Sequence, residues 1–540
     1  MRADYEALGP CTANYTPLTP LSFLERAAAI YAPDEAVIYG SYRASWGQVR
    51  ARVHAMADAL RARGIGPGDT VSVICPNIPQ MFELHYAVPM AGAVLHSINV
   101  RLEAETIAYM LEHSDSRLVL CDTAFAPLLR AAFALMGREM PVVDIIDAQA
   151  GAAPAFGGDD YEALIAAGDA AFAGVPVANE WQAIALNYTS GTSGRPKGVV
   201  CHHRGAYLMA LGTAAGWSLP QRPTYMSIVP MFHCNGWNHP WAMAIMGARM
   251  VFVRDTTAAR MYDAIRAHKV THFGAAPIIL QMLADAPDGV KGGFDHVVNA
   301  FTAGAPPPAA VLEKMRALGF EVMHVYGLTE TYGHVTQCVA REEWADLSAE
   351  QQAEMAARQG VGFPMLEAVD VVDRQTGQPV PENGETQGEI VIRGNVVMSG
   401  YYKDAVATAA AFKDGWFWSG DAAVKFPGGQ VKIRDRLKDV IISGGENISS
   451  VEVEGVLFRH PAVALAAVVA MDDAKWGEVP CAFVELREGA RATEAEIIAF
   501  CRARLAGFKC PKAVRFEDLP KTSTGKIQKF QLRARLSAPN

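Results

Sequence analysis

The first part of the chain alternates between helix-like and strand-like patterns, and this alternation restricts the fold more than any other feature. A capping-box sequence at residues 45–48 precedes apolar residues at helical spacing, and a β-branched run follows at residues 70–75. A helix pattern then begins near Pro79, and residues 118–122 form a further strand pattern. Strands separated by helices predict parallel sheets with helices on both faces. The alternation returns at residues 271–283 and 320–326, so we expect two doubly wound α/β subdomains.

The pattern changes after residue 360. Short strand patterns at 368–372, 388–393 and 430–433 are separated by glycine-containing turns, which predicts a small antiparallel subdomain or a small β-barrel. A charged run at 434–439 follows and is a candidate hinge. Beyond it we expect helices at 451–460 and 492–505 around a strand at 463–470. Because 540 residues exceed what one core holds, we predict a large domain at 1–436 and a smaller α+β domain at 437–540.

Charge and composition exclude several classes of protein. The net charge of −9 argues against nucleic-acid binding, which favours a basic balance. The longest apolar run, at residues 462–471, is too short to cross a membrane, and no secretory signal pattern is present at the N-terminus. The nine cysteines include no CxxC pair, which indicates free thiols in a reducing compartment. We therefore expect a cytoplasmic protein without a membrane partner.

The loop at residues 188–198, Tyr-Thr-Ser-Gly-Thr-Ser-Gly-Arg-Pro-Lys-Gly, carries the strongest chemical signal. Its glycines allow backbone amides to turn toward an anion, its hydroxyls add donors, and Lys197 adds a positive charge. It is not a Walker loop, because two residues separate Gly194 from Lys197 and Gly198 stands where Ser or Thr is required. Strand patterns at 183–187 and 198–201 flank it, so the sequence predicts a phosphate-binding loop between two strands.

Six further segments follow this loop in a fixed order, at residues 230–237, 304–308, 326–331, 418–421, 436–447 and 520–526. With the loop, they resemble the adenylate-forming superfamily over essentially the whole chain. The resemblance implies a ligase that joins a small carboxylic acid to AMP, releases pyrophosphate and then forms a thioester. ATP, Mg²⁺ and coenzyme A are the implied cofactor and co-substrates.

The resemblance also implies roles for individual residues. Thr329 would contact the α-phosphate, Glu330 and Thr192 would place Mg²⁺, and Tyr326 would stack on adenine. Asp421 and Arg436 would hold the ribose, and Lys526 would bridge the reacting carboxylate and phosphate, since a lysine side chain is a mobile point charge. The remaining nucleotide contacts would come from the loop and from one glycine-containing segment: Thr189, Ser190, Gly191, Ser193, Gly194 and Lys197, and Gly304, Ala305 and Pro306.

The thioester step implies a second set of residues. Gly445 would let the pantetheine arm pass, because it has no side chain, and Trp476 would lie beside the adenine of coenzyme A. Lys438 falls at the family's hinge position, about which the mobile C-terminal domain would rotate between the two half-reactions.

The acyl pocket implied by the family is lined by His233, Trp237, Ala303, Gly304, Tyr332, Gly333 and His334. Trp237 and Tyr332 are bulky, which favours a short- to medium-chain acid, and His233 would gate the site. Residues 231–241 and 326–334 resemble the methylmercaptopropionate-CoA ligases, so 3-methylmercaptopropionate is the favoured acid. Butyrate, hexanoate, a medium-chain fatty acid and an aryl acid stay open.

Other functions have less support. The His and Cys residues at 201–203 and 233–239 lack zinc spacing. A module that loads a carrier protein predicts an adjoining carrier motif, and none follows Lys526. A non-catalytic AMP sensor would be expected to lack Lys526, Glu330 or Asp421, and all three residues are present. The sequence leaves open whether the chain is a monomer or a homodimer.

Overall fold

The computed structural model describes residues 8–151, 155–189, 195–304, 307–437, 439–444, 446–473, 475–521 and 527–537. The chain forms two compact units. Unit 1 contains the residues up to Asp255 together with Leu328–Gly333 and Asn395–Thr408, and unit 2 contains Thr256–Gly327, His334–Gly394 and the residues from Ala409 onward.

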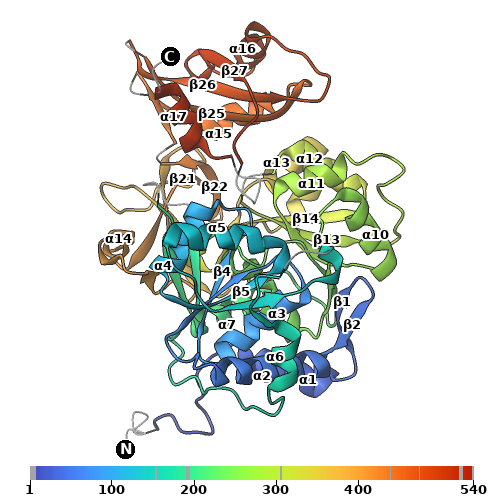
Figure 1. The fold of residues 1–540 in the computed structure, drawn as a ribbon. Helices are drawn as coiled ribbons and strands as arrows, with labels where there is room; N and C mark the ends of the chain where they lie inside the picture. The colour runs from blue at the N-terminus through green and yellow to red at the C-terminus, as the bar shows by residue number, and fades with distance from the viewer. Residues whose placement is uncertain are drawn as a thin grey trace, which may run out of the picture. The chain divides into compact units, whose positions relative to one another are not determined.

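The main sheet of unit 1 has eight strands in the order β19-β9-β8-β4-β3-β5-β6-β7 (Figure 1). The six strands from β8 to β7 are parallel, whereas β9 runs antiparallel to β8 and β19 antiparallel to β9. The bounds, in sheet order, are Gly400–Tyr401, Lys197–His202, Ala183–Thr189, Val94–Ile98, Thr70–Ile74, Ser116–Asp122, Val142–Ile145 and Asp159–Asp160. The strands predicted at 70–75, 118–122, 183–187 and 198–201 are therefore confirmed.

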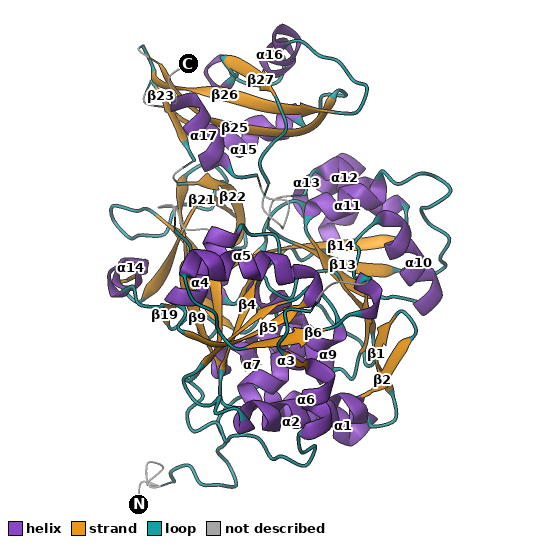
Figure 2. Cartoon of the chain, viewed as in Figure 1, coloured by secondary structure: helices purple, strands orange, loops and turns teal. Residues whose placement is uncertain are grey.

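Helices cover both faces of this sheet, as the alternating pattern predicts. Helix α4 (Ala104–His113) and α5 (Ala126–Met136) bury Ile107, Leu111 and Leu129 against Ile74 and Val119. Figure 2 shows α2 (Trp46–Ala62), α3 (Pro79–Met90) and α6 (Tyr161–Ala167) on the other side of the sheet from these two helices. The capping box of α2 is present, with the Ser45 side chain accepting from Gln48 N and the Gln48 side chain accepting from Ser45 N.

A smaller part of unit 1 is built on a second set of strands. Strands β10 (Thr224–Ser227), β11 (Arg249–Phe252) and β1 (Glu35–Tyr39) are parallel, and β2 (Tyr42–Ser45) closes a hairpin on β1. The helices of this region are α1 (Leu21–Tyr31), α7 (His203–Gly216), α8 (Cys234–Trp237) and α9 (His239–Ile245).

Unit 2 begins with a second α/β region. Strands β12 (His272–Ala275), β13 (Val298–Thr302) and β14 (Phe320–Leu328) are parallel, and β15 (Gly333–Gln337) pairs antiparallel with β16 (Val361–Gly362). The helices between and after them are α10 (Ala258–His268), α11 (Pro277–Ala284), α12 (Ala309–Ala317) and α13 (Ala349–Ala356). The predicted second region of parallel strands is present.

Of the two predicted forms, the described strands after residue 360 take the antiparallel sheet and not the closed barrel. Its order is β17-β18-β21-β20, and β22 pairs with the same edge of β21 as β20. Because β20 and β22 share that edge, the pairings among described strands do not return to β17. The bounds are Leu366–Val372, Gln387–Gly394, Trp416–Phe426, Phe412–Lys413 and Gln430–Arg436 for β17, β18, β21, β20 and β22, and α14 is Ala405–Ala411.

Strand β22 extends further than its sequence predicts. The segment 434–439 was expected to be a charged run between strands, but Asp435 and Arg436 pair with Ala422 and Asp421 of β21. Charged residues are depleted in strands, so the local pattern favoured a loop, and pairing with β21 outweighed it. The hinge candidate is thus reduced to the residues after Arg436.

The C-terminal residues form a separate sheet with helices on both faces. Its strands are β24-β23-β26-β25, with β27 parallel to β26, and alternate residues of β25 and β26 face opposite sides. Val468 and Ala482 pack with α15 and α16, whereas Val469 and Phe483 pack with Leu532 of α17. The bounds are Ile441–Ser443 (β23), Glu446–Ile448 (β24), Ser450–Leu457 (α15), Val463–Asp473 (β25), Gly477–Leu486 (β26), Glu494–Arg502 (α16), Ala513–Phe516 (β27) and Lys529–Ser537 (α17).

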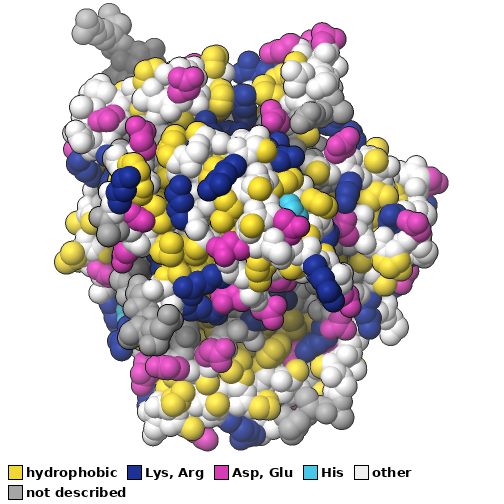
Figure 3. Space-filling view, turned by 90° about the horizontal axis from the view of Figure 1, so that it is seen from above, with side chains coloured by type: hydrophobic (Ala, Val, Ile, Leu, Met, Phe, Trp, Pro, Cys, Tyr) yellow, Lys and Arg dark blue, Asp and Glu magenta, His cyan; other side chains and the backbone are white. Residues whose placement is uncertain are grey.

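The structure bears on the predictions about membranes and nucleic acids. Among the described residues, no helix combines the length and apolar character needed to cross a membrane. On the face shown in Figure 3, Lys and Arg side chains are interspersed with Asp and Glu, so this face carries no extended basic surface.

Candidate active site

The predicted phosphate loop joins two paired strands. Thr189, the last residue of β8, lies opposite Lys197, the first residue of β9. The ladder therefore fixes both ends of the loop at one edge of the hairpin. Within the loop, Ser190, Gly191, Thr192, Ser193 and Gly194 lie outside the described residues.

Lys197 and Glu330 meet at one tyrosine that the sequence did not single out. The Lys197 ammonium lies 4.8 Å from the ring centroid of Tyr401, a cation–π arrangement. The Tyr401 hydroxyl donates to Oε1 of Glu330 at 2.9 Å. Strand β19 places Tyr401 by pairing it with Val199 of β9, and Met398 N donates to the Glu330 carbonyl at 2.7 Å. One tyrosine thereby contacts a cation through its ring and a carboxylate through its hydroxyl.

The arrangement fits a role for Glu330 beside a divalent cation. The carboxylate is half-buried and accepts a bond from a neutral hydroxyl, which leaves its charge uncompensated by that contact. Ionised carboxylates offer about four lone-pair sites and are preferred ligands of Mg²⁺. Thr192, the second predicted metal-placing residue, is outside the described part of the chain.

Thr329 contacts a strained turn that also carries His233 and Trp237. The Cys234 thiol donates to Thr329 Oγ1 at 3.3 Å. Cys234, Asn235, Gly236, Trp237 and Asn238 all have φ between 40° and 63°, the left-handed region. Burial raises the pKa of Cys234 to about 12, so its sulfur is a protonated donor.

The predicted acyl-pocket residues divide between the units. In unit 1, Trp237 and Tyr332 are buried, and the Tyr332 ring packs edge-on against Trp241 with centroids 5.7 Å apart. Gly333 is also buried, and a Cβ there would approach Met209 at 3.2 Å. In unit 2, His334 lies among aromatic rings, 5.2 Å from Phe301 and 5.8 Å from Phe363. Burial lowers the pKa of His334 to about 3, so this imidazole is neutral.

The three predicted adenosine-binding side chains contact one another in unit 2. The Tyr326 hydroxyl donates to Asp421 Oδ2 at 2.6 Å, and Arg436 Nε lies 2.7 Å from Asp421 Oδ1. Burial and the neighbouring Asp421 charge raise the pKa of Tyr326 well above its usual range, so the hydroxyl remains a donor. The contacts bind both carboxylate oxygens but leave further lone-pair sites for ribose hydroxyls.

The segment after Ala303 supplies an open glycine. Gly304 has φ +92°, which favours glycine, and a Cβ at this position would meet no atom within 4 Å. Backbone is thus exposed where an adenine contact is predicted. Ala303 is buried, and Ala305 and Pro306 lie outside the described residues.

Trp476 lies beside Gly444, the residue before the Gly445 that is predicted to admit pantetheine. Gly444 N donates to the Trp476 carbonyl at 2.8 Å, and a Cβ on Gly444 would approach Trp476 Cε3 at 2.8 Å. The indole is 46% exposed, so it can stack on a ligand. The next residue, Gly445, is outside the described residues, as are Lys438 and Lys526.

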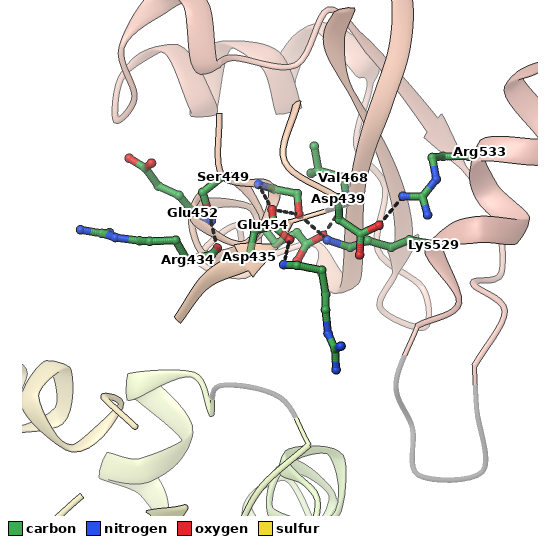
Figure 4. A network of polar contacts seen from close by, with 11 residues as sticks. Arg434, Asp435, Asp439, Ser449, Glu452, Glu454, Val468, Lys529 and Arg533 are labelled. Carbon is green, nitrogen blue, oxygen red and sulfur yellow. Dashed lines mark hydrogen bonds and ion pairs between the residues drawn. The ribbon is translucent and has the colours of Figure 1, made fainter. Parts of the chain in front are cut away.

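A polar network includes Asp435 and Asp439, the residues that lie on either side of the predicted hinge position in the sequence (Figure 4). Asp435 Oδ2 accepts from the backbone and hydroxyl of Ser450 at 2.6 and 2.5 Å. Lys529 donates to Ser450 and lies 2.7 Å from Glu454, while Arg533 pairs with Asp439. The network therefore joins the end of β22 to α15 and α17 across the hinge position.

Several residues that these contacts connect could not be predicted from the sequence. Tyr401 is 71 positions from Glu330, and Lys529 is 75 positions from Glu454, so no local pattern relates either pair. Asn235 did have a local signal, because an Asn-Gly pair favours left-handed backbone.

Comparisons with known proteins agree with the geometry. A model of the AMP-binding enzyme family matches residues 24–402, and a model of the AMP-binding enzyme C-terminal domain matches residues 452–526. The peroxisomal acetate/butyrate–CoA ligase of Arabidopsis thaliana is 47% identical over 550 residues, covering 98% of this chain and 97% of that protein. A 2-methylpropanoate–CoA ligase of Humulus lupulus is 46% identical, again covering 98% and 97%.

The fold agrees as well. The crystal structure of a benzoate CoA ligase from Burkholderia xenovorans superposes with a TM-score of 0.82 at 25% identity, covering 95% of this chain and 99% of that one. The predicted mixed α/β fold, with a large N-terminal part and a smaller C-terminal domain, is confirmed. The chain belongs to the AMP-binding enzyme family, and within it to the acyl-CoA synthetases, which are acid–thiol ligases.

Proposed function

We propose that the protein joins a short-chain carboxylic acid to coenzyme A through an acyl-adenylate, using ATP and Mg²⁺ and releasing AMP and pyrophosphate. The observation that carries this proposal is the contact of Tyr401 with Lys197 and Glu330, next to the β8–β9 hairpin that carries the predicted phosphate loop and is called the phosphate hairpin below. Adenylation moves negative charge onto phosphate oxygens, so a fixed cation and a metal-binding carboxylate are the groups it requires.

Each side chain then has a distinct task. Lys197 and the loop from Thr189 bind the outer phosphates, Thr329 donates to the α-phosphate, and Glu330 holds Mg²⁺, which neutralises phosphate charge when bound. Asp421, oriented by Tyr326 and Arg436, accepts from the ribose hydroxyls. His233 stands before the turn that leads to Trp237 and gates the carboxylate. Lys526 bridges carboxylate and phosphate, and Trp476 with Gly445 receives coenzyme A.

A short acid fits the side chains predicted to surround it. Trp237 and Tyr332 are buried and bulky, and the buried Trp241 packs against Tyr332, which leaves little length for an acyl tail. The relatives named for acetate, butyrate and 2-methylpropanoate support the same size. Among such acids we favour 3-methylmercaptopropionate, because a thioether is apolar and polarisable and suits aromatic surroundings. Butyrate is the alternative.

A pyrophosphate-release screen tests the substrate. Straight-chain, branched, thioether and aryl acids are offered with ATP and Mg²⁺, with and without coenzyme A. We expect the highest kcat/KM for acids whose chain, counted from the carboxyl carbon, has about four to six heavy atoms, because each methylene beyond the pocket must displace packed side chains. AMP should accumulate only with coenzyme A present. A maximum at long-chain acids, or release of ADP and orthophosphate, would contradict the proposal.

Removal of the Tyr401 hydroxyl should impair adenylation selectively. In Tyr401→Phe, Glu330 loses a hydrogen bond to an ionised group, for which a loss of about 10- to 100-fold in kcat is expected. The Mg²⁺ concentration for half-maximal rate should rise as well. Tyr402→Phe is the matched control, since its hydroxyl donates to Asp115 at 2.8 Å on the surface. Equal activity of the two variants would refute the role of Tyr401.

The compartment and assembly remain predictions. The free thiols favour the cytoplasm, whereas the Arabidopsis relative carries a peroxisomal name. Cell fractionation distinguishes the two locations. Light scattering of the purified protein distinguishes a monomer from a homodimer.

A further inference from the structure

The turn Cys234–Asn238 is held by side chains from three other parts of unit 1. Left-handed backbone is unfavourable for residues with a Cβ, and asparagine tolerates it better than most. Five consecutive residues adopt it here, including Trp237. Such strain persists only where surrounding contacts over-determine the conformation, and it concentrates at functional sites. The contacts that hold this turn therefore indicate which parts of the site it positions.

Asn235 makes the central contacts. Its Oδ1 accepts from Asn187 Nδ2 at 2.6 Å, and its Nδ2 donates to Ser97 Oγ at 3.2 Å. Ser97 Oγ lies 3.5 Å from Asn187 Oδ1, so the three side chains form a closed polar group. Asn235 is fully buried, and Ser97 and Asn187 are 2% exposed. In a dry environment, each lost partner leaves a buried polar atom unsatisfied.

The three residues come from elements with different tasks. Asn187 is in β8, two residues before Thr189 at the start of the phosphate loop, and Ser97 is in the neighbouring strand β4. Asn235 lies between His233 and Trp237. At the last residue of the turn, Asn238 Nδ2 donates to the Tyr332 carbonyl, and at its first residue Cys234 contacts Thr329. The turn is thus tied both to the phosphate hairpin and to the Thr329–Tyr332 segment.

We propose that Asn235 is a positioning residue for acyl-adenylate formation, which fixes His233 and Trp237 relative to the phosphate hairpin through Asn187 and Ser97. This inference rests on the proposed function. Strand β8 is paired on both sides, with β4 and β9, whereas the turn has no ladder of its own. Loss of the bridge should therefore displace the turn and the carboxylate, not the strand and ATP.

Two substitutions at Asn235 separate its side chain from its backbone. Asn235→Gly removes the amide but accepts the left-handed conformation without strain, and Asn235→Ala removes the amide and retains the strain. For both we expect a kcat for carboxylate-dependent pyrophosphate exchange about 10- to 100-fold lower, since a displacement near 1 Å can cost that much. The KM of the carboxylate should rise, and the Kd of ATP should change little.

Ser97→Ala is a second, milder variant that should move the same parameters in the same direction. Its matched control is Ser116→Ala, a buried serine of the same sheet whose hydroxyl bonds with Ser72 and Ser114 instead. That control should keep the wild-type KM of the carboxylate. Ser97→Ala also keeps the test decisive if the Asn235 variants fold poorly.

The outcomes are distinct. Wild-type activity in Asn235→Gly with impaired Asn235→Ala would mean that backbone conformation alone matters, and it would overturn the amide bridge. A Kd of ATP that rises as much as the KM of the carboxylate would also overturn it. If the wild-type protein shows no exchange with any acid, the proposed function itself fails. Normal exchange in the wild type and in all variants would leave the proposed function standing and would overturn the role of Asn235.

Discussion

Lys526→Ala should lower the rate of acyl-adenylate formation by at least about 100-fold, while thioester formation from supplied acyl-adenylate survives. The expected size is that of removing one preorganised group aimed at developing charge. Only the first half-reaction moves charge between carboxylate and phosphate, so only that step needs the lysine at this place. Pyrophosphate exchange measures the first step, and coenzyme A consumption from synthetic acyl-adenylate measures the second.

The neighbouring lysine provides the control. Lys521 belongs to the same segment but lies 2.8 Å from Glu485 within the C-terminal domain. Lys521→Ala should retain both half-reactions, because exposed ion pairs contribute little. Equal loss of both steps in Lys526→Ala would mean that the substitution damages the domain and not the chemistry.

Lys529→Met should destabilise the C-terminal domain by about 3 kcal/mol, the lower end of the cost of breaking a buried ion pair from one side. Burial, with a smaller contribution from the Asp435 charge, raises the pKa of Glu454 although Lys529 opposes the shift. Burial alone would lower the pKa of Lys529, but the charges of Glu454 and Asp435 outweigh it, and the pKa rises. Without the ammonium, the acidic side chains of Glu454 and Asp435 remain in the network of Figure 4 and have lost the nearby lysine cation.

Denaturant unfolding, with hydrogen exchange in α15 and α17, measures the loss. The double variant Lys529→Met with Glu454→Leu should recover much of it, because a buried pair replaced by apolar side chains is often neutral in stability. Lys509→Met is the comparison for a more exposed pair, with Glu452 at 2.8 Å, and should cost at most about 1 kcal/mol. A similar loss in Lys509→Met and Lys529→Met would contradict the argument.

Local patterns predicted those elements whose information is local. The cap of α2, the strands around the phosphate loop and the parallel α/β regions all follow from short-range periodicity, because side chains on one face of a helix or strand recur at a fixed spacing. The extension of β22 through Arg436 did not, since its stability comes from pairing with β21. Local patterns likewise left open whether the strands after residue 360 form an antiparallel sheet or a closed barrel, because strand order depends on long-range pairing.

By itself, the sequence determined the family, the α/β architecture and most of the residues proposed to touch ATP, since glycines, hydroxyls and charges at fixed spacing carry that chemistry. Only the tertiary structure decided which side chains hold those residues in place. Three contacts join positions that are 71, 48 and 75 residues apart: the hydrogen bonds Tyr401–Glu330 and Asn187–Asn235 and the ion pair Lys529–Glu454. Hydrogen bonds and ion pairs depend on distance in space, and folding alone brings such positions together.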